Sequence, residues 1–369
     1  MPQALKDTYS RKFLNDFADK VKNTYKIFDK NNFLNSVMDN TWDELKLKQR
    51  VRKISQTLGT YLPETYGKAL EILLSICESC TGFPYLFFPD FVEVYGQKQE
   101  DWEISMRALE YFTVKSSSEF AVRPFFIIDE GRMIKQMIKW SKNGNEHVRR
   151  LSSEGCRPRL PWGQSLTMFK HDPDPVISVL ENLKCDPSLY VRKSVANNLN
   201  DISKDNPSVV IDIIKSWKGV NRNTDWILRY GSRTLIQKSN PQVMKLFGYE
   251  KLADGFIVKD ASLCAEPSEL EIGDSCSLSY SFYVRGGGPV HIRIEYAIDF
   301  VKARGNTSRK KFFLSDKTVS GGEKIMGNRV HKWGDLTTRK HYPGKHYIFL
   351  LINGCEVGSV MINLKLKVK

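Results

Sequence analysis

The sequence predicts a multidomain protein of α-then-β class, an all-α solenoid of helical repeats followed by a β-sandwich. The chain has 369 residues, more than the ~250–300 residues at which a single core usually stops growing. Apolar residues recur at helical spacing in early segments such as YGKALEILLSI and GRMIKQMIKW. From about Gly255 onward, short runs alternate polar with apolar residues. We therefore expect a helical domain over residues 1–254 and a β-rich domain over residues 255–369.

The helical part contains an internal repeat. The segments HVRRLSSEGCRPRL, YVRKSVANNLNDIS and WILRYGSRTLIQKS can be aligned so that Val148, Val191 and Ile227 coincide. The resulting spacings of 43 and 36 residues suit stacked helix pairs of the HEAT or armadillo kind. This part of the chain is therefore predicted to be a HEAT-like solenoid.

The C-terminal part contains several predicted strands. They are SCSLSYSFYVR (275–285), VHIRIEYAI, HYIFLLING and SVMINLKLKVK. The segment RGGGP separates the first two and is predicted to form a hairpin-like turn. Short strands with turn signals between them are typical of an immunoglobulin-like β-sandwich. The cysteine and tryptophan pattern of antibody domains is not evident, so only the architecture is predicted.

The chain is strongly basic. Lys and Arg number 56 against 42 Asp and Glu, which gives a net charge of +14 and a pI near 9.3. This balance favours an anionic polymer or surface as a partner. No stretch approaches the ~18 uninterrupted apolar residues of a membrane span, and the polar start of the chain lacks a signal-peptide core. We therefore expect a cytoplasmic protein with no membrane partner.

The cysteines do not indicate a metal site. There are seven of them, an odd number, and their scatter favours reduced thiols over a disulfide framework. Cys77 and Cys80 form a lone CxxC, and the second ligand pair that a zinc site needs does not follow. We interpret this pair as helix packing, and we expect no metal and no other cofactor.

The middle repeat predicts a helix with two different faces. Val195, Leu199 and Ile202 recur at i, i+4 and i+7 and are expected to be buried. A separate polar stripe is expected to form a binding face on the solenoid, and the alternative is an ordinary solvated helix surface. The alignment places polar residues of the three repeats together at this stripe: Lys193 with Arg150 and Arg229, Asn197 with Glu154 and Arg233, and Asp201 with Pro158 and Gln237.

The loop GCRPRLPWG lies beside this stripe. Arg157, Arg159 and Trp162 fall within six residues and are separated by two prolines, which restrict the backbone. Guanidinium groups suit phosphates because they are planar and always charged. Trp162 has two interpretations: it packs in a core, which is the common role of a single Trp, or its indole face forms one wall of a site for a flat cation.

These segments resemble a known family. HVRRLSSEGCRPRLPWG, YVRKSVANNLNDISKDNP, TDWILRYGSRTL and the opening LKDTYSRKFLNDFA are similar to the AlkC-type DNA alkylation repair glycosylases, which are HEAT-like repeat proteins related to AlkD. The similarity spans most of residues 1–250, and some members also carry a C-terminal immunoglobulin-like domain. The resemblance implies a monofunctional glycosylase of base excision repair that removes cationic 3-methyladenine and 3-methylcytosine from kinked double-stranded DNA without flipping the base into a deep pocket.

The resemblance also implies the site residues. The family's catalytic positions match Glu119, Glu154, Trp162 and Asp201, and its basic lining matches Arg150, Arg157 and Arg159. A carboxylate near the sugar would stabilise the oxocarbenium-like transition state and orient water. Glu154 or Asp201 is expected to do so, with Glu119 in support and Trp162 against the base or sugar. Glu119 has an alternative role as a helix-start acid or as a structural partner of Arg123.

The C-terminal part concentrates positive charge. Residues 302–345 hold 12 basic and 3 acidic residues, in segments that look like loops or strand edges. We expect them to contact DNA phosphates, and the alternative is a charged, soluble surface. The DNA-binding residues expected in the whole chain are Arg150, Arg157, Arg159, Lys193, Asn197, Arg229, Arg233, Lys302, Arg304, Arg309 and Lys332.

Two further interpretations stay open at this stage. The chain could be a helical-repeat protein that binds DNA without catalysis, or a protein-interaction scaffold. A scaffold has no need of the two acids and Trp162 around one site, and a simple DNA binder has little use for carboxylates that repel phosphates. The leading expectation is a monomeric, bacterial, nucleoid-associated glycosylase whose partner is alkylated double-stranded DNA.

Overall fold

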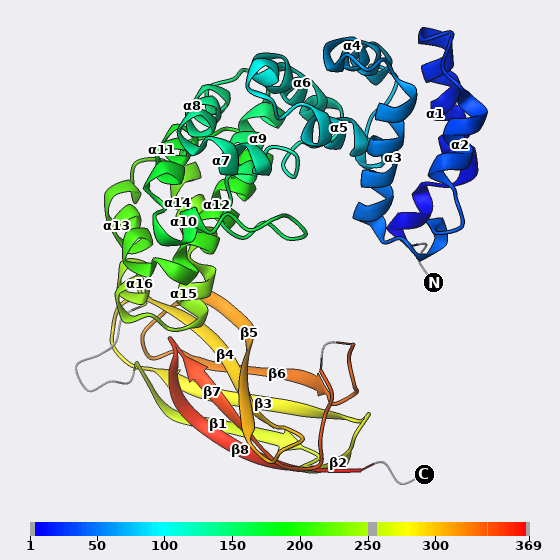
Figure 1. The fold of residues 1–369 in the computed structure, drawn as a ribbon. Coiled ribbons are helices and arrows are strands. Elements are labelled where there is room, and N and C mark those ends of the chain that lie inside the picture. Colours follow the sequence, from blue (N-terminus) through cyan, green and yellow to red (C-terminus); the bar gives the residue numbers. More distant parts are fainter. Residues whose placement is uncertain (1–3, 250–256, 338, 367–369) are drawn as a thin grey trace. The chain divides into compact units, whose positions relative to one another are not determined.

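The computed structural model describes residues 4–249, 257–337 and 339–366 (Figure 1). The chain divides into two compact units, residues 1–232 and residues 233–369. The boundary that the sequence predicts, between residues 254 and 255, lies outside the described residues. Among the described helices, none is long and apolar enough to cross a membrane.

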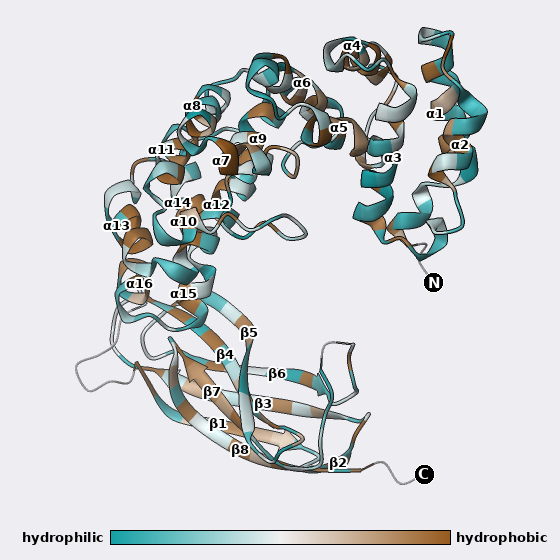
Figure 2. Ribbon diagram, in the orientation of Figure 1, coloured by the Kyte–Doolittle hydropathy of each residue, from teal (hydrophilic) through white to brown (hydrophobic). Residues whose placement is uncertain are grey.

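The described secondary-structure elements of the first unit are all helices, joined by loops (Figure 1). Figure 2 shows hydrophobic and hydrophilic residues interspersed along these helices, as expected when each helix buries one side. The helices are η1 (Leu5–Thr8), α1 (Arg11–Thr24), α2 (Lys30–Val37), η2 (Trp42–Glu44), α3 (Leu47–Tyr61), α4 (Tyr66–Cys77), η3 (Phe83–Tyr85), α5 (Phe87–Tyr95), η4 (Gln99–Asp101), α6 (Trp102–Lys115), α7 (Arg123–Ile128), α8 (Glu130–Ser141), α9 (Glu146–Gly155), α10 (Met168–His171), α11 (Asp174–Leu183), α12 (Leu189–Asp205), α13 (Pro207–Trp217) and α14 (Arg222–Gly231).

The three aligned repeats are neighbouring helices. α12 packs against α9 on one side and α14 on the other. Val148, Val191 and Ile227, the residues that the alignment superimposes, are all buried. The helices α12 and α14 approach closely at Gly231, which has no side chain. A Cβ at this position would lie only 3.0 Å from the Cβ of Leu199. The HEAT-like stacking is therefore present where the sequence predicts it.

The second unit begins with two short helices and continues as strands. The predicted order of a helical region followed by an immunoglobulin-like β domain is confirmed. Its elements are α15 (Arg233–Gln237), α16 (Pro241–Leu246), β1 (Val258–Glu266), β2 (Glu269–Glu271), β3 (Ser275–Val284), β4 (Val290–Val301), β5 (Thr307–Val319), β6 (Lys324–Lys332), β7 (Gly344–Ile352) and β8 (Cys355–Lys365).

The strands form a three-stranded sheet, β1-β3-β6, and a five-stranded sheet, β2-β8-β7-β4-β5. The hairpin predicted at RGGGP is therefore wrong, because β3 and β4 lie in different sheets. Each strand finds its partners elsewhere, β3 in β1 and β6, and β4 in β5 and β7. The chain crosses from one sheet to the other at this segment, and Gly286 begins the crossing with a φ of +90° that glycine adopts readily.

The sandwich core contains one tryptophan, Trp333, which is fully buried. Its indole N–H donates to the Sγ of Cys276 at 3.3 Å, and all seven cysteines of the chain are free. The basic segments of the second unit lie partly on β5 and β6, which end the five-stranded and the three-stranded sheet, and partly in the loops before β5 and after β6. Strand edges and loops are the two positions that the sequence predicts for them.

Candidate functional site

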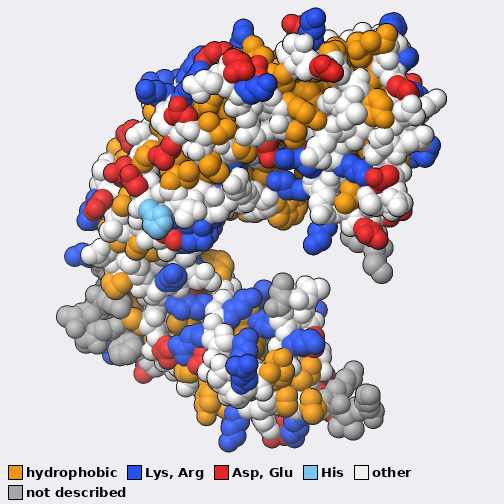
Figure 3. Space-filling view, viewed as in Figure 1, with side chains coloured by type: hydrophobic (Ala, Val, Ile, Leu, Met, Phe, Trp, Pro, Cys, Tyr) orange, Lys and Arg blue, Asp and Glu red, His pale blue; other side chains and the backbone are white. Residues whose placement is uncertain are grey.

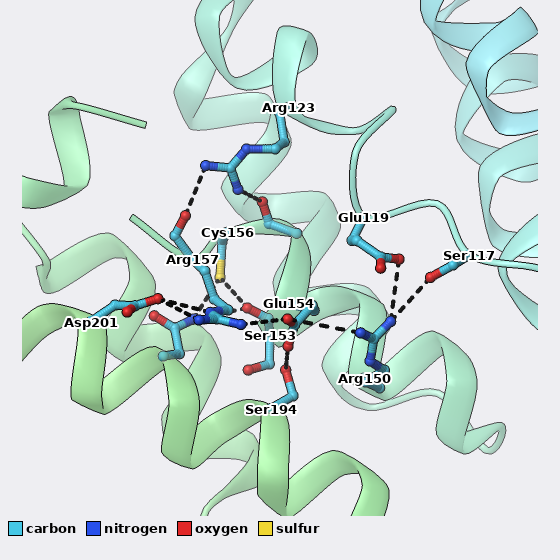
Figure 4. A network of polar contacts seen from close by, with 12 residues as sticks. Ser117, Glu119, Arg123, Arg150, Ser153, Glu154, Cys156, Arg157, Ser194 and Asp201 are labelled. Atoms are coloured by element: carbon cyan, nitrogen blue, oxygen red, sulfur yellow. Dashed lines mark hydrogen bonds and ion pairs between the residues drawn. The ribbon is translucent and has the colours of Figure 1, made fainter. Parts of the chain in front are cut away.

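A buried arginine joins two of the predicted catalytic acids (Figure 4). Arg157, just beyond the end of α9, contacts Glu154 Oε1 through Nη1 at 2.6 Å and Asp201 Oδ2 through Nη2 at 2.8 Å. Glu154, Arg157 and Asp201 are 6%, 7% and 2% exposed. The sequence predicts these three residues as site residues, and in the structure their side chains form an internal network and not a solvated stripe.

The network extends to Glu119 through Arg150. Arg150 lies one helical turn before Glu154 on α9 and reaches its Oε1 at 3.8 Å, and its Nη1 contacts Glu119 Oε2 at 3.2 Å. Glu119, in the segment between α6 and α7, thus pairs with Arg150, and its suggested pairing with Arg123 is not observed. Lys204 contacts Asp201 Oδ1 at 2.8 Å on the more exposed side.

Ion pairing favours the charged form of the buried Arg157. Burial alone would lower the pKa of Arg157, but the neighbouring carboxylates of Glu154 and Asp201 raise it further than burial lowers it. Removing one partner of such a pair leaves an uncompensated buried charge, which is strongly destabilising. The arrangement fixes both carboxylates in place before any ligand binds.

The polar side of α12 that faces α9 differs from the predicted one. Ser194 donates to Glu154 Oε2 at 2.6 Å, and Asn198 donates to the Ser153 carbonyl at 2.8 Å. With Asp201 they form a buried polar stripe at i, i+4 and i+7. Sequence reasoning missed Ser194 and Asn198, although this spacing next to an apolar stripe was a usable signal.

Arg123 supports the loop that follows α9. Its guanidinium is fully buried and donates to the carbonyls of Gly155 and Arg157, each at 2.9 Å, and to that of Gln164. Burial lowers the pKa of Arg123 to about 10. The sequence signal for this residue was a single charge in the apolar run FAVRPFF.

Trp162 is exposed on the same loop. It is 67% exposed, which excludes the core role suggested for it, and its φ of +63° is unusual for a residue other than glycine. Its carbonyl accepts a hydrogen bond from Lys48 Nζ at 3.3 Å, and that ammonium also lies 4.3 Å from the centre of the Phe120 ring. The sequence contains no signal for Lys48, which lies 114 residues away.

A half-open cavity of about 170 Å³ adjoins Trp162 and Glu119. Most of its wall is apolar, and Asp90 and Glu93 are among its polar lining residues, with Lys48, Ser117 and Glu119. Both carboxylates are held by Arg52, and burial raises the pKa of Glu93. The cavity places an apolar surface next to the acidic and aromatic groups of the network.

The remaining predicted residues of the helical unit lie around the network. Arg159 pairs with Asp205 at the surface and lowers the pKa of that carboxyl. Lys193 is exposed on α12, and Asn197 and Arg229 are half-buried on α12 and α14. Arg233 is exposed and belongs to the second unit.

The basic residues predicted in the second unit differ in their surroundings. Figure 3 shows Lys and Arg side chains gathered over β5. Arg304 and Lys332 are exposed, Lys302 is half-buried, and none of these three makes an ion pair with another described residue. Arg309 instead pairs with Asp299 and Glu356.

Comparisons with known proteins agree with this architecture. A family model described as "DNA alkylation repair enzyme" matches residues 107–235, and one described as "Uncharacterised protein YhaZ, C-terminal Ig-like domain" matches residues 259–366. YhaZ of Bacillus subtilis (strain 168) is 45% identical over 350 residues, which are 95% of this chain and 96% of that protein. The structure of Pseudomonas fluorescens alkylpurine DNA glycosylase AlkC, bound to DNA containing an abasic site analog, is 38% identical with a TM-score of 0.92 and covers 98% of this chain and 100% of that one.

A helical-repeat unit with the DNA alkylation repair motif, followed by an immunoglobulin-like sandwich, defines a class of DNA repair proteins. The chain belongs to the AlkC-type family of DNA alkylation repair enzymes. The resemblance noted in the sequence is thereby confirmed over nearly the whole chain.

Proposed function

We propose that this protein is a monofunctional DNA glycosylase that excises 3-methyladenine and 3-methylcytosine from alkylated double-stranded DNA. The observation that carries the proposal is the buried Glu154–Arg157–Asp201 network beside the exposed Trp162. It occurs in a chain that is 38% identical, over 98% of its length, to an alkylpurine DNA glycosylase bound to DNA.

The proposed chemistry uses fixed carboxylates. A base methylated at N3 is cationic and leaves as a neutral molecule, so little acid catalysis is needed. The positive charge moves to the sugar as the glycosidic bond breaks, which is the situation that carboxylates stabilise in glycosidases. Glu154 or Asp201 would stabilise this sugar cation and orient the attacking water, because each carboxylate retains acceptor capacity beyond its contacts with Arg157.

The other site residues have supporting roles in this proposal. Glu119 holds Arg150 and so maintains the position of Glu154. Trp162 would contact the methylated base or the sugar, since an exposed indole face attracts a cation. Arg159, Lys193 and the basic residues of the second unit would bind phosphates. Arg157 is buried and paired with both acids. We therefore propose that it mainly positions these carboxylates and does not primarily bind DNA phosphates.

The experiment that tests the proposal is a base-release assay. The purified protein is incubated with DNA treated with a methylating agent, and released bases are separated and identified. We expect 3-methyladenine and 3-methylcytosine in the soluble fraction with the DNA backbone left intact, because the proposed enzyme is monofunctional. Absence of any released base would contradict the enzyme assignment.

The alternative is a helical-repeat protein that binds DNA without excising bases. One observation favours it: both acids are already paired with Arg157 in the free protein. Binding of methylated DNA without base release would identify this second function.

A further inference from the structure

The buried Arg123 is unusual in its choice of partners. Its three nitrogens donate to three different backbone carbonyls, Nη1 to Gly155, Nη2 to Arg157 and Nε to Gln164. None of the ion pairs found among the described residues involves it. A fully buried guanidinium without a direct carboxylate partner is costly to desolvate. An apolar residue could pack at this position without that cost, so packing alone does not explain an arginine here.

The three carbonyls are those that shape the site. Gly155 is the last residue of α9 and directly follows Glu154, so its carbonyl is one of the groups that a helix end leaves unpaired. Arg157 forms ion pairs with both Glu154 and Asp201. Gln164 lies two residues after Trp162. Arg123 therefore joins the beginning and the end of the loop that holds Arg157 and Trp162. Figure 4 shows the bond from Arg123 to the carbonyl of Arg157.

A planar guanidinium is well suited to this task. Its N–H groups point in fixed directions within one plane, whereas a lysine has one nitrogen on a flexible stem. Lysine at this position could satisfy one or two of the carbonyls but not all three. The loop also has other contacts: Gly163 and Leu166 donate backbone bonds to Leu160 and Pro158, Ser165 donates to the Pro158 carbonyl, Lys48 donates to the Trp162 carbonyl, and Arg159 pairs with Asp205. Arg123 differs from these contacts in that one side chain binds carbonyls at both ends of the loop.

We infer that Arg123 is a positioning residue of the active site, which acts through the backbone of residues 155–164 to set the placement of Arg157 and Trp162. This inference rests on the proposed glycosylase function and goes beyond it by assigning a residue that does not touch the substrate. Its expected effect is on the chemical step, because a small displacement of catalytic groups can lower a rate about 100-fold.

The test compares two conservative variants, Arg123→Lys and Arg149→Lys. Arg149 is a matched control on α9: it is also largely buried, pairs with Asp186, and donates to the carbonyls of Asn143 and Gly144, which lie away from the site. Thermal unfolding, affinity for methylated DNA and the single-turnover rate of base release are measured for both at a temperature well below their unfolding midpoints.

We expect both variants to lose thermal stability. Arg123→Lys should also release base about 10- to 100-fold more slowly with little change in DNA affinity, and Arg149→Lys should keep the wild-type rate. A wild-type rate in Arg123→Lys, or an equal loss in both variants, would overturn the inference. If Arg123→Lys does not fold, Arg123→Gln, which keeps two donors, takes its place.

A readout without catalysis separates this inference from the proposed function. Hydrogen exchange of the amides of Gly163 and Leu166 reports the loop directly. We expect faster exchange in Arg123→Lys and unchanged exchange in Arg149→Lys. Unchanged exchange in Arg123→Lys would overturn the positioning role even if the wild type releases base, and absence of base release by the wild type would contradict only the proposed function.

Discussion

Arg157 is the residue on which the site is organised, because it binds acids from two helices. Glu154 is three residues before it on α9 and Asp201 is 44 residues after it on α12. The sequence could propose all three as site residues from the repeat pattern and the family resemblance. It could not predict that they bind one another, because that depends on the depth at which α12 packs against α9.

Two further residues show what a sequence pattern leaves out. Arg123 contacts only backbone carbonyls, and no side-chain pattern encodes such partners. Ser194 was next to the predicted stripe but one position away from it, and on a helix one position turns a side chain by about 100°. The periodicity therefore predicted helix α12 and its buried apolar face, but it did not predict the polar residues that face α9.

His331 gives a prediction for the dependence of stability on pH. It is buried on β6 among Tyr296, Phe300 and Trp333, and burial, with the nearby charge of Arg339 adding to it, lowers its pKa from 6.5 to about 4. Between these two values the unfolded chain binds a proton that the native state does not. His331 should therefore contribute a fall of about 2 kcal/mol in the free energy of unfolding between pH 7 and pH 5, measured by urea denaturation as the difference between wild type and a variant without this histidine.

The variant His331→Gln isolates this effect. Its unfolding free energy should depend less on pH over the same range, because glutamine does not titrate. His171→Gln, which alters an exposed histidine of the first unit, is the control and should behave as the wild type. An identical dependence on pH in His331→Gln and wild type would show that the stability change arises elsewhere.

At the scale of elements, the sequence predicted the helices, the stacking of the three repeats and the strands named from it, but it did not predict how the strands pair. The alternation in SCSLSYSFYVR and VHIRIEYAI predicts β3 and β4 well. Their assignment to different sheets was missed, because a glycine-rich turn permits a crossing between sheets as readily as a hairpin. The basic segments were predicted at strand edges or in loops, and the structure places them in both, on the outer strands β5 and β6 and in the loops beside them.

These basic segments lead to a prediction about how DNA binding depends on salt concentration. We propose that the exposed basic residues of this unit bind phosphates, so the combined variant Lys302→Gln, Arg304→Gln, Lys332→Gln should bind DNA more weakly. Each phosphate contact that is lost should reduce the slope of log K against log salt by about 0.9, hence by up to about 3 in total. The slope is obtained from binding titrations at several salt concentrations.

Arg309→Gln is the matched control from the same basic block. Arg309 is engaged by Asp299 and Glu356, so its loss should change the slope by less than that of an unpaired residue. If the combined variant keeps the wild-type slope, the second unit does not hold phosphates through these residues.

For the whole molecule, the net charge indicates the kind of partner, and the local charge at the site indicates the chemistry that the site could perform. The chain carries +14, which suits a polyanionic partner, while the site buries three carboxylates among arginines. The proposed glycosylase function would account for both features together, because basic residues would hold the DNA and the fixed carboxylates would act on one base. Composition alone predicts only the first.

The most direct test of this account is single-turnover base release by Glu154→Gln and Asp201→Asn, measured together with DNA affinity. Asp205→Asn, which alters a surface carboxylate paired with Arg159, is the control. We predict that at least one of the two site variants loses about 100-fold or more in the rate of release while it still binds DNA, and that Asp205→Asn keeps the wild-type rate. Undiminished release of 3-methyladenine and 3-methylcytosine by both site variants would contradict the assignment of catalysis to these carboxylates.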